Sequence, residues 1–187
     1  MFLMRFRPTQ EAFAMLIFDS ITFKNKNGID LLTPYIARWE YKDRLDGSFP
    51  VIECDGQAKA ILTLFHIFNN IRVMWSNPIK ITSGYRTLEH QKRLIKEGKK
   101  AAKYSPHTKG VALDILAGTT YDNEQLYHLI TDNYPWLRIG FHAYKQKFVH
   151  MDVAPLLPDG CIPDEKVILR GREYWLKDVW HERGARW

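Results

Sequence analysis

Apolar residues recur at helical spacing between positions 55 and 75, in the stretch DGQAKAILTLFHIFNNIRVMW. The apolar face that this spacing predicts comprises Ala58, Ile61, Leu62, Phe65, Phe68 and Val73. Asp55 is the expected N-cap of this helix, and the Asn-Pro pair at 77–78 ends it. Polar amphipathic stretches at 88–100 and 123–134 predict two further helices.

Shorter runs alternate apolar and polar side chains with the period of two that is typical of β-strands. These runs are IKITSGYRT at 79–87, VALDI at 111–115, RIGFHAY at 138–144 and FVHMDV at 148–153. The last two are expected to form a hairpin around the polar turn at 145–147. Together the elements predict one α+β domain over residues 1–187, an antiparallel sheet with helices packed on one face.

The two ends of the chain carry weaker patterns. The first 50 residues mix aromatic residues, charges and turn formers, and they predict a lead-in with a short strand or helix. The last 30 residues are basic and aromatic, and we expect them to wrap around the domain. Cys54 and Cys161 lie far apart in the sequence and form no metal-binding pair. A disulfide between them is compatible with the sequence but not indicated, so we interpret both as buried or incidental thiols.

Composition narrows the class of protein. The chain has 187 residues, of which 45% are hydrophobic and 26% charged, as in an ordinary globular protein with a core of its own. A net charge of +6 favours polyanionic surroundings such as nucleic acid, anionic lipid or a cell wall. No segment approaches the roughly 20 consecutive apolar residues of a membrane span. The short apolar run after Arg5 and Arg7 is followed by no cleavage site, so no signal peptide is predicted.

The strand VALDI contains a carboxylate, Asp114, that a buried strand does not need. Burying it without a partner costs several kcal/mol. Ala112 lies on the same face and leaves room beside it, and His107 lies in the preceding loop. On the strand FVHMDV, His150 and Asp152 share one face. Two imidazoles and a carboxylate suit zinc, whose positive charge would compensate that of Asp114. By spacing alone, a zinc site and ordinary hydrogen-bonded histidines explain this pattern equally well.

Three blocks of sequence resemble a known family. In chain order they are SGYRT (83–87), SPHTKGVALD (105–114) and FVHMDV (148–153). They resemble the zinc D-Ala-D-Ala carboxypeptidase superfamily, peptidase family M15, which includes peptidoglycan carboxypeptidases, phage endolysins and the hedgehog signalling domain. The middle block fits the family pattern S-x-H-x-x-G-x-A-x-D at every fixed position. The resemblance spans roughly residues 50–155 and implies a hedgehog-like or DD-peptidase-like fold, with the zinc site on the face of the sheet opposite the helices.

The resemblance also implies roles for single residues. It makes His107, Asp114 and His150 the ligands of a Zn²⁺ cofactor. It makes Arg86 the cation near the substrate carbonyl or carboxylate. A guanidinium suits that role because it stays charged and can stabilise an oxyanion through two N–H groups. The alternative for Arg86 is a surface salt bridge at the end of a strand.

One position departs from the family pattern. Several branches carry a glutamate or aspartate, the general base, three residues before the last histidine ligand, and here that position is Lys147. Asp152 lies on the same strand face as His150 and is a candidate either for the base or for orienting a ligand. His142, on the preceding strand, is a candidate acid–base group near neutral pH. We favour His142 for the proton transfer.

The function implied is zinc-dependent hydrolysis of peptide bonds in the stem peptides of bacterial peptidoglycan, of carboxypeptidase or endopeptidase type. A non-catalytic zinc-binding module and a structural phage component on the same fold are the alternatives. The basic, aromatic tail at 170–187 suggests nucleic acid, but it also contains Glu173, Asp178 and Glu182, so a solvated or wall-binding face is favoured. Without a signal peptide, we expect cytoplasmic synthesis and action on the wall after release, as in a phage-encoded lysis or virion protein; a leaderless bacterial protein also fits.

Overall fold

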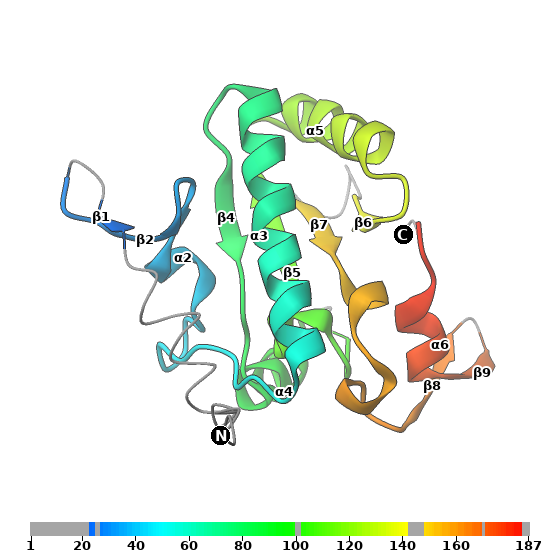
Figure 1. Ribbon diagram of the computed structural model, residues 1–187. Coiled ribbons are helices and arrows are strands. Elements are labelled where there is room, and N and C mark those ends of the chain that lie inside the picture. The colour runs from blue at the N-terminus through cyan, green and yellow to red at the C-terminus, as the bar shows by residue number, and fades with distance from the viewer. Residues whose placement is uncertain (1–22, 25–26, 100–101, 142–147, 170, 185–187) are drawn as a thin grey trace, which may run out of the picture.

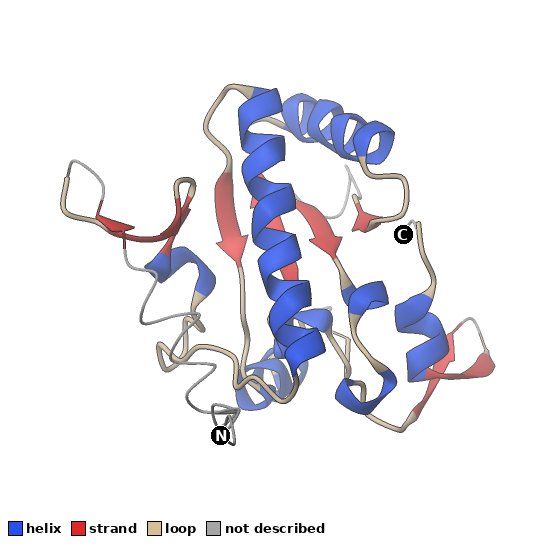
Figure 2. Cartoon of the chain, in the orientation of Figure 1, coloured by secondary structure: helices blue, strands red, loops and turns tan. Residues whose placement is uncertain are grey.

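The computed structural model describes residues 23–24, 27–99, 102–141, 148–169 and 171–184. Its helices are α2 (Arg38–Tyr41), α3 (Asp55–Trp75), α4 (Leu88–Lys96), α5 (Thr120–Asn133) and α6 (Leu176–His181), with short 3₁₀ turns η1 (Pro106–Lys109), η2 (Ala154–Leu156) and η3 (Asp159–Cys161). Its strands are β1 (Phe23–Lys24), β2 (Asp30–Thr33), β3 (Ile36–Ala37), β4 (Lys80–Ser83), β5 (Ala112–Leu116), β6 (Arg138–Gly140), β7 (Val149–Asp152), β8 (Lys166–Leu169) and β9 (Arg172–Trp175). Figure 2 shows this mixture of helices and strands.

The central sheet has the strand order β4-β5-β7-β6, and each neighbouring pair is antiparallel. The long helix α3 crosses one face of this sheet, and α5 lies beyond one end of α3 (Figure 1). The predicted mixture of antiparallel strands and helices is therefore confirmed. Strands β6 and β7 pair as expected, while the turn predicted at 145–147 lies outside the described residues.

Helix α3 begins and ends where the apolar spacing predicts, but two details differ. Its N-cap is Cys54, whose sulfur accepts a hydrogen bond from the Gln57 backbone, and Asp55 is the first helical residue. Leu62 and Val73, expected in the buried face, are 44% and 62% exposed. Each lies away from the buried stripe on the helical wheel. The buried residues of the helix are Gln57, Ala58, Ala60, Ile61, Leu64, Phe65, Ile67, Phe68 and Ile71.

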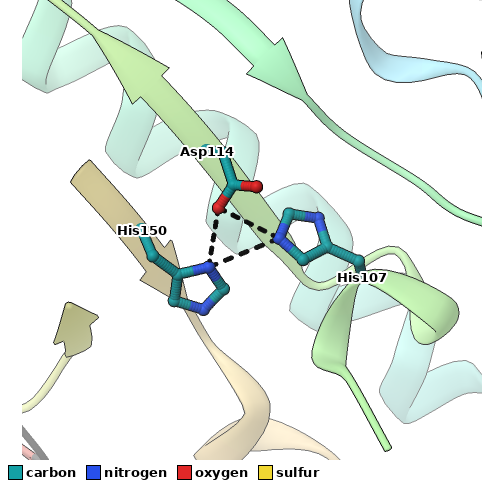
Figure 3. Close-up of side chains that lie close together, drawn as sticks. All are labelled: His107, Asp114 and His150. Atoms are coloured by element: carbon teal, nitrogen blue, oxygen red, sulfur yellow. Dashed lines mark hydrogen bonds and ion pairs between the residues drawn. The ribbon is translucent and has the colours of Figure 1, made fainter. Parts of the chain in front are cut away.

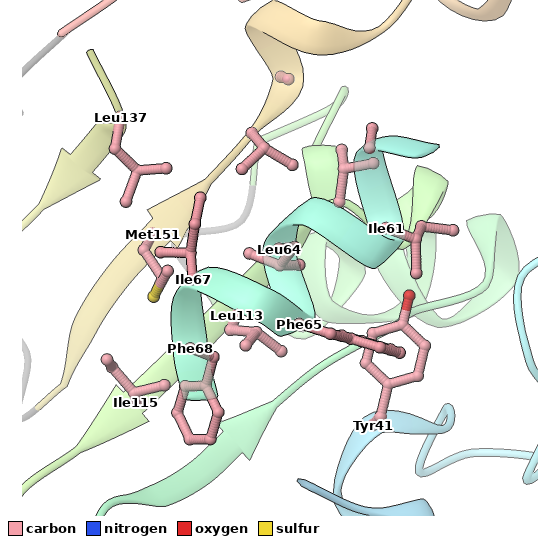
Figure 4. Packing of buried hydrophobic residues seen from close by; sticks show 14 of the residues in the cluster. Tyr41, Ile61, Leu64, Phe65, Ile67, Phe68, Leu113, Ile115, Leu137 and Met151 are labelled. Atoms are coloured by element: carbon pink, nitrogen blue, oxygen red, sulfur yellow. The ribbon is translucent and has the colours of Figure 1, made fainter. Parts of the chain in front are cut away.

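The two faces of the central sheet differ in chemistry, as the period of two requires. One face carries apolar side chains that pack against α3 (Figure 4). These apolar sheet residues are Ile81, Leu113, Ile115, Ile139, Val149 and Met151. The opposite face carries the polar side chains, because Asp114 lies across from His150, and Asp152 follows on the same face of β7 across from the small Ala112. The side chains with candidate chemistry therefore gather on the face that α3 does not cover.

The N-terminal part of the chain supports the loops next to this polar face. Tyr41, at the end of α2, is fully buried, and its hydroxyl donates to the Gly110 carbonyl oxygen at 2.6 Å. Its own carbonyl oxygen accepts from the Tyr85 backbone N–H at 2.7 Å. A Cβ atom at position 84 would lie 2.5 Å from that carbonyl oxygen, so only glycine fits there. The lead-in therefore includes a helix, as expected, and this helix packs against two loops of the polar face.

The C-terminal part packs against the rest of the chain through α6, whose Leu176 and Trp180 are buried. The hairpin of β8 and β9 does not pack in the same way, because nearly all of its side chains are exposed. The interpretation of the two cysteines as buried or incidental thiols is wrong, since Cys54 and Cys161 form a disulfide, although Cys161 is buried as expected. The fold brings η3 to the start of α3, although 107 residues separate the two cysteines. Among the described helices, none has the length and apolar content to cross a membrane.

Candidate metal centre

Three side chains from separate elements converge on the polar face (Figure 3). His107 lies on η1, Asp114 on β5 and His150 on β7. Asp114 Oδ1 lies 3.2 Å from His107 Nε2 and 2.9 Å from His150 Nδ1, and these two nitrogens are 3.3 Å apart. The structure therefore brings together the three residues that the sequence analysis assigned as metal ligands.

The spacing of these atoms matches the requirement of a small divalent cation. Bonds of roughly 2.0–2.2 Å in a tetrahedral arrangement place neighbouring ligand atoms about 3.3–3.6 Å apart. The three observed separations, 2.9, 3.2 and 3.3 Å, lie close to that range. Two imidazole nitrogens and one carboxylate oxygen are also a donor set that suits zinc. Three protein donors leave one of four positions for a further ligand, as catalytic sites require.

The outer nitrogen of each imidazole has a hydrogen-bond acceptor that selects the tautomer. His107 Nδ1 lies 2.6 Å from the Gly84 carbonyl oxygen, which can only accept, so this nitrogen carries the proton. His150 Nε2 lies 3.1 Å from Asp152 Oδ2 and donates to that carboxylate. The lone pairs of His107 Nε2 and His150 Nδ1 are thereby directed at the point where a metal ion would bind.

Asp114 is held in place by Arg86. Arg86 Nη2 donates to Asp114 Oδ2 at 2.6 Å, so the other oxygen, Oδ1, faces the two histidines. The remaining guanidinium contacts are Nε to Ser83 Oγ at 2.9 Å and Nη1 to Gln91 Oε1 at 3.3 Å. The Arg86 side chain is 15% exposed and lies beside the candidate metal ligands, so its ion pair with Asp114 is not a salt bridge at the surface.

Burial and charge affect the two histidines in opposite ways. Burial is the largest influence on His107 and lowers its pKa, which favours the neutral ring that a metal needs. Burial would also lower the pKa of His150, but hydrogen bonds to Asp114 and Asp152 outweigh it and raise the pKa to about 9. Burial would raise the pKa of Asp114, but its contacts with His107 and His150 prevail and hold this pKa well below the ordinary value. The carboxylate is therefore ionised, and a metal ion would compete with a proton on His150.

The loop that carries His107 has a defined shape. Pro106 begins η1, and Gly110 ends it with φ at +72°, a left-handed conformation that glycine adopts without strain. The His107 carbonyl oxygen accepts from the Arg86 backbone N–H at 3.2 Å, so the loops that carry these two residues are joined directly. The glycine of the middle block, Gly110, thus shapes the loop that carries His107.

Of the two candidates for proton transfer, the structure describes Asp152 but not His142. His142 and Lys147 lie outside the described residues. Asp152 is fully buried and contacts His150 Nε2, the ring nitrogen that does not face Asp114. This contact is suited to orienting the ring. Arg138, which lies across from Asp152 on β6, was missed by the sequence analysis, although an arginine within the apolar run LRIG is as unusual as an aspartate within VALDI.

The comparisons with known proteins agree with this geometry. The model of the Peptidase M15 family matches residues 49–152, which is more than half of the chain. The protein therefore belongs to peptidase family M15, and the family expected from the three blocks is confirmed. Membership implies a metallopeptidase, and the metal of this family is typically zinc. A search of curated proteins gives no significant match.

Proposed function

We propose that this protein hydrolyses peptide bonds in the stem peptides of bacterial peptidoglycan, on a fold similar to that of DD-peptidases and hedgehog domains. The observation that carries the proposal is the convergence of His107 Nε2, Asp114 Oδ1 and His150 Nδ1 within 3.3 Å of one another, in a chain of family M15. The net charge of +6 suits a cell wall rich in carboxylates and phosphates.

Each residue of the site has its own role in the proposed amide hydrolysis. His107, Asp114 and His150 would hold the metal, for which the chemistry supplied when bound is Lewis-acid activation of water and of a carbonyl group. Arg86 fixes Asp114 through Nη2 and keeps a positive charge beside the ligands, where negative charge develops on the carbonyl oxygen. We assign the proton transfer from water to His142, and the orientation of the His150 ring to Asp152.

The assay is digestion of purified peptidoglycan followed by mass spectrometry of the released fragments. We expect release of terminal D-alanine or of stem-peptide fragments, loss of this activity with a chelator, and recovery with added zinc. His150→Ala should be inactive, whereas the control His66→Ala, on the exposed side of α3, should keep full activity. The mass of the fragments then distinguishes a carboxypeptidase from an endopeptidase.

A non-catalytic zinc-binding module is the second candidate, because Lys147 stands where several relatives have a carboxylate base. In that case the zinc-loaded protein would sediment with peptidoglycan but release no fragment at any pH. Turnover by the wild-type protein excludes this alternative.

Two variants separate the proposed roles in proton transfer. His142→Ala should retain zinc and lose about 10²–10⁴-fold in rate, the usual contribution of general acid–base catalysis. Asp152→Asn should instead weaken zinc binding by about 10–100-fold, because it replaces the charged acceptor that orients His150 with a neutral amide. An inactive Asp152→Asn with normal zinc binding, together with an active His142→Ala, would exchange the two assignments.

A further inference from the structure

The cross-strand register brings a buried cation next to the carboxylate that contacts His150. Arg138 lies across from Asp152, and Gly140 lies across from His150 on the same two strands. Arg138 is 4% exposed and Asp152 is fully buried. Gly140 contributes no side chain beside His150, so Arg138 is the charged group that β6 brings to this face. The centre therefore continues from His150 through Asp152 to Arg138.

The two carboxylate oxygens of Asp152 have different partners. Oδ1 lies 3.4 Å from Arg138 Nε and accepts from the Ala154 backbone N–H at 3.0 Å. Oδ2 accepts from His150 Nε2 at 3.1 Å. Arg86 and Asp114 repeat this arrangement on the other side, where one oxygen contacts an arginine and the other contacts histidine. Each buried carboxylate thus has one oxygen held by an arginine and one directed at a metal ligand.

Arg138 also contacts a segment that lies outside the region matched by the family model. Its Nη1 donates to the Val179 carbonyl oxygen of α6 at 2.8 Å. Helix α6 lies outside residues 49–152, the part of the chain that the family model matches. The sequence of contacts therefore runs from α6 through Arg138 and Asp152 to His150.

We propose that Arg138 is a positioning residue of the metal centre. By holding Oδ1 of Asp152, it keeps Oδ2 directed at His150 and so fixes the ring whose Nδ1 would bind metal. A purely structural role, in which Arg138 only fastens α6 to the sheet, is the competing explanation. The inference rests on the proposed metal centre but not on the proposed substrate.

The test measures the zinc dissociation constant of the full-length protein by competition with a chelating dye. Arg138→Gln should bind zinc about 10–100-fold more weakly, the usual effect of losing a group that orients a ligand. Arg138→Lys keeps the charge but not the planar fork, so its affinity should fall between those of the wild type and Arg138→Gln. The visible spectrum of the Co²⁺-loaded Arg138→Gln protein should also change, because the orientation of His150 changes.

Two controls separate positioning from stability. Leu176→Ala loosens the packing of α6 without touching a charge, and it should lower the Tm while keeping the zinc affinity of the wild type. Arg93→Gln removes an exposed arginine that pairs with Glu97 and should change neither. The inference is overturned if Arg138→Gln binds zinc like the wild type, or if Leu176→Ala loses as much affinity. If Arg138→Gln does not fold, an unchanged dissociation constant in Arg138→Lys overturns it instead. A wild-type protein that binds no zinc would contradict the proposed metal centre itself.

Discussion

Replacing Asp114 with asparagine tests the metal centre through the stability of the fold. Asp114 is 4% exposed; its Oδ1 faces the two histidines and its Oδ2 pairs with Arg86 at 2.6 Å. Asparagine keeps the shape of the side chain but removes its negative charge, so it weakens metal binding and leaves the Arg86 charge without its anion. We therefore expect one loss of stability that depends on metal and one that does not.

The metal-dependent loss follows from mass action. A ligand at 1,000 times its dissociation constant stabilises the folded state by about 4 kcal/mol. In a chain of 187 residues, each kcal/mol raises the Tm by about 2–4 °C, so zinc should raise the wild-type Tm by about 8–16 °C. If Asp114→Asn weakens binding a hundredfold, the same zinc concentration supplies about 1.4 kcal/mol, or about 3–6 °C.

The metal-independent loss comes from the broken ion pair. Removing one partner of a buried pair costs about 3–5 kcal/mol. Arg86 is 15% exposed and keeps its contacts with Ser83 and Gln91, so we expect a loss near the lower end, about 3 kcal/mol. Urea unfolding in the presence of a chelator measures this loss separately from the effect of zinc.

The assay compares thermal unfolding of the wild type and of Asp114→Asn, each with chelator and with zinc. Asp132→Asn, on the exposed side of α5, is the matched control and should respond to zinc like the wild type. An Asp114→Asn protein with the full zinc-dependent increase in Tm would remove Asp114 from the set of ligands.

Three further predictions concern neighbouring groups. Arg86→Gln should lower kcat/KM by an amount equivalent to about 2–4 kcal/mol of transition-state stabilisation; unchanged kcat/KM with a lower Tm would limit Arg86 to holding Asp114. His150 has a folded pKa of about 9, above the ordinary 6.5, so in the chelated protein its stabilising contribution is complete below about pH 6.5 and is lost as the pH rises through about 9. Urea unfolding at pH 6, 7.5 and 9 measures this, and a chelated His150→Gln protein should lack that dependence. Burial would raise the pKa of Asp43, but hydrogen bonds from Thr87, Leu45 and His90 prevail and lower it. Asp43→Asn should therefore cost about 1–3 kcal/mol of stability at pH 7, and less as the pH falls below about 4. If Asp43→Asn lowers the stability equally at pH 7 and below about pH 4, the Asp43 charge contributes nothing to stability.

Local patterns allowed the main elements to be predicted from the sequence. The helix expected at 55–75 forms over the same residues, because its apolar spacing determines its type and most of its buried face. The family pattern singled out His107, Asp114 and His150 as candidate metal ligands, and the structure brings them together. Such a prediction is possible because few residue types can bind a metal ion. Helix α4 is shorter than predicted and ends at Lys96, because the polar residues after it carry no packing signal.

Contacts between distant segments were decided only by the tertiary structure. The pairing of β5 with β7 sets Asp114 against His150, and no local pattern specifies that register. The contact of Arg138 with Val179, the hydrogen bond from Tyr41 to Gly110 and the disulfide of Cys54 with Cys161 likewise join segments far apart in the chain. The sequence by itself determined which residue types carry the chemistry, since these follow from spacing and ligand preference. Which groups hold them in place depended on the tertiary structure, because burial and long-range hydrogen bonds arise only when the whole chain packs.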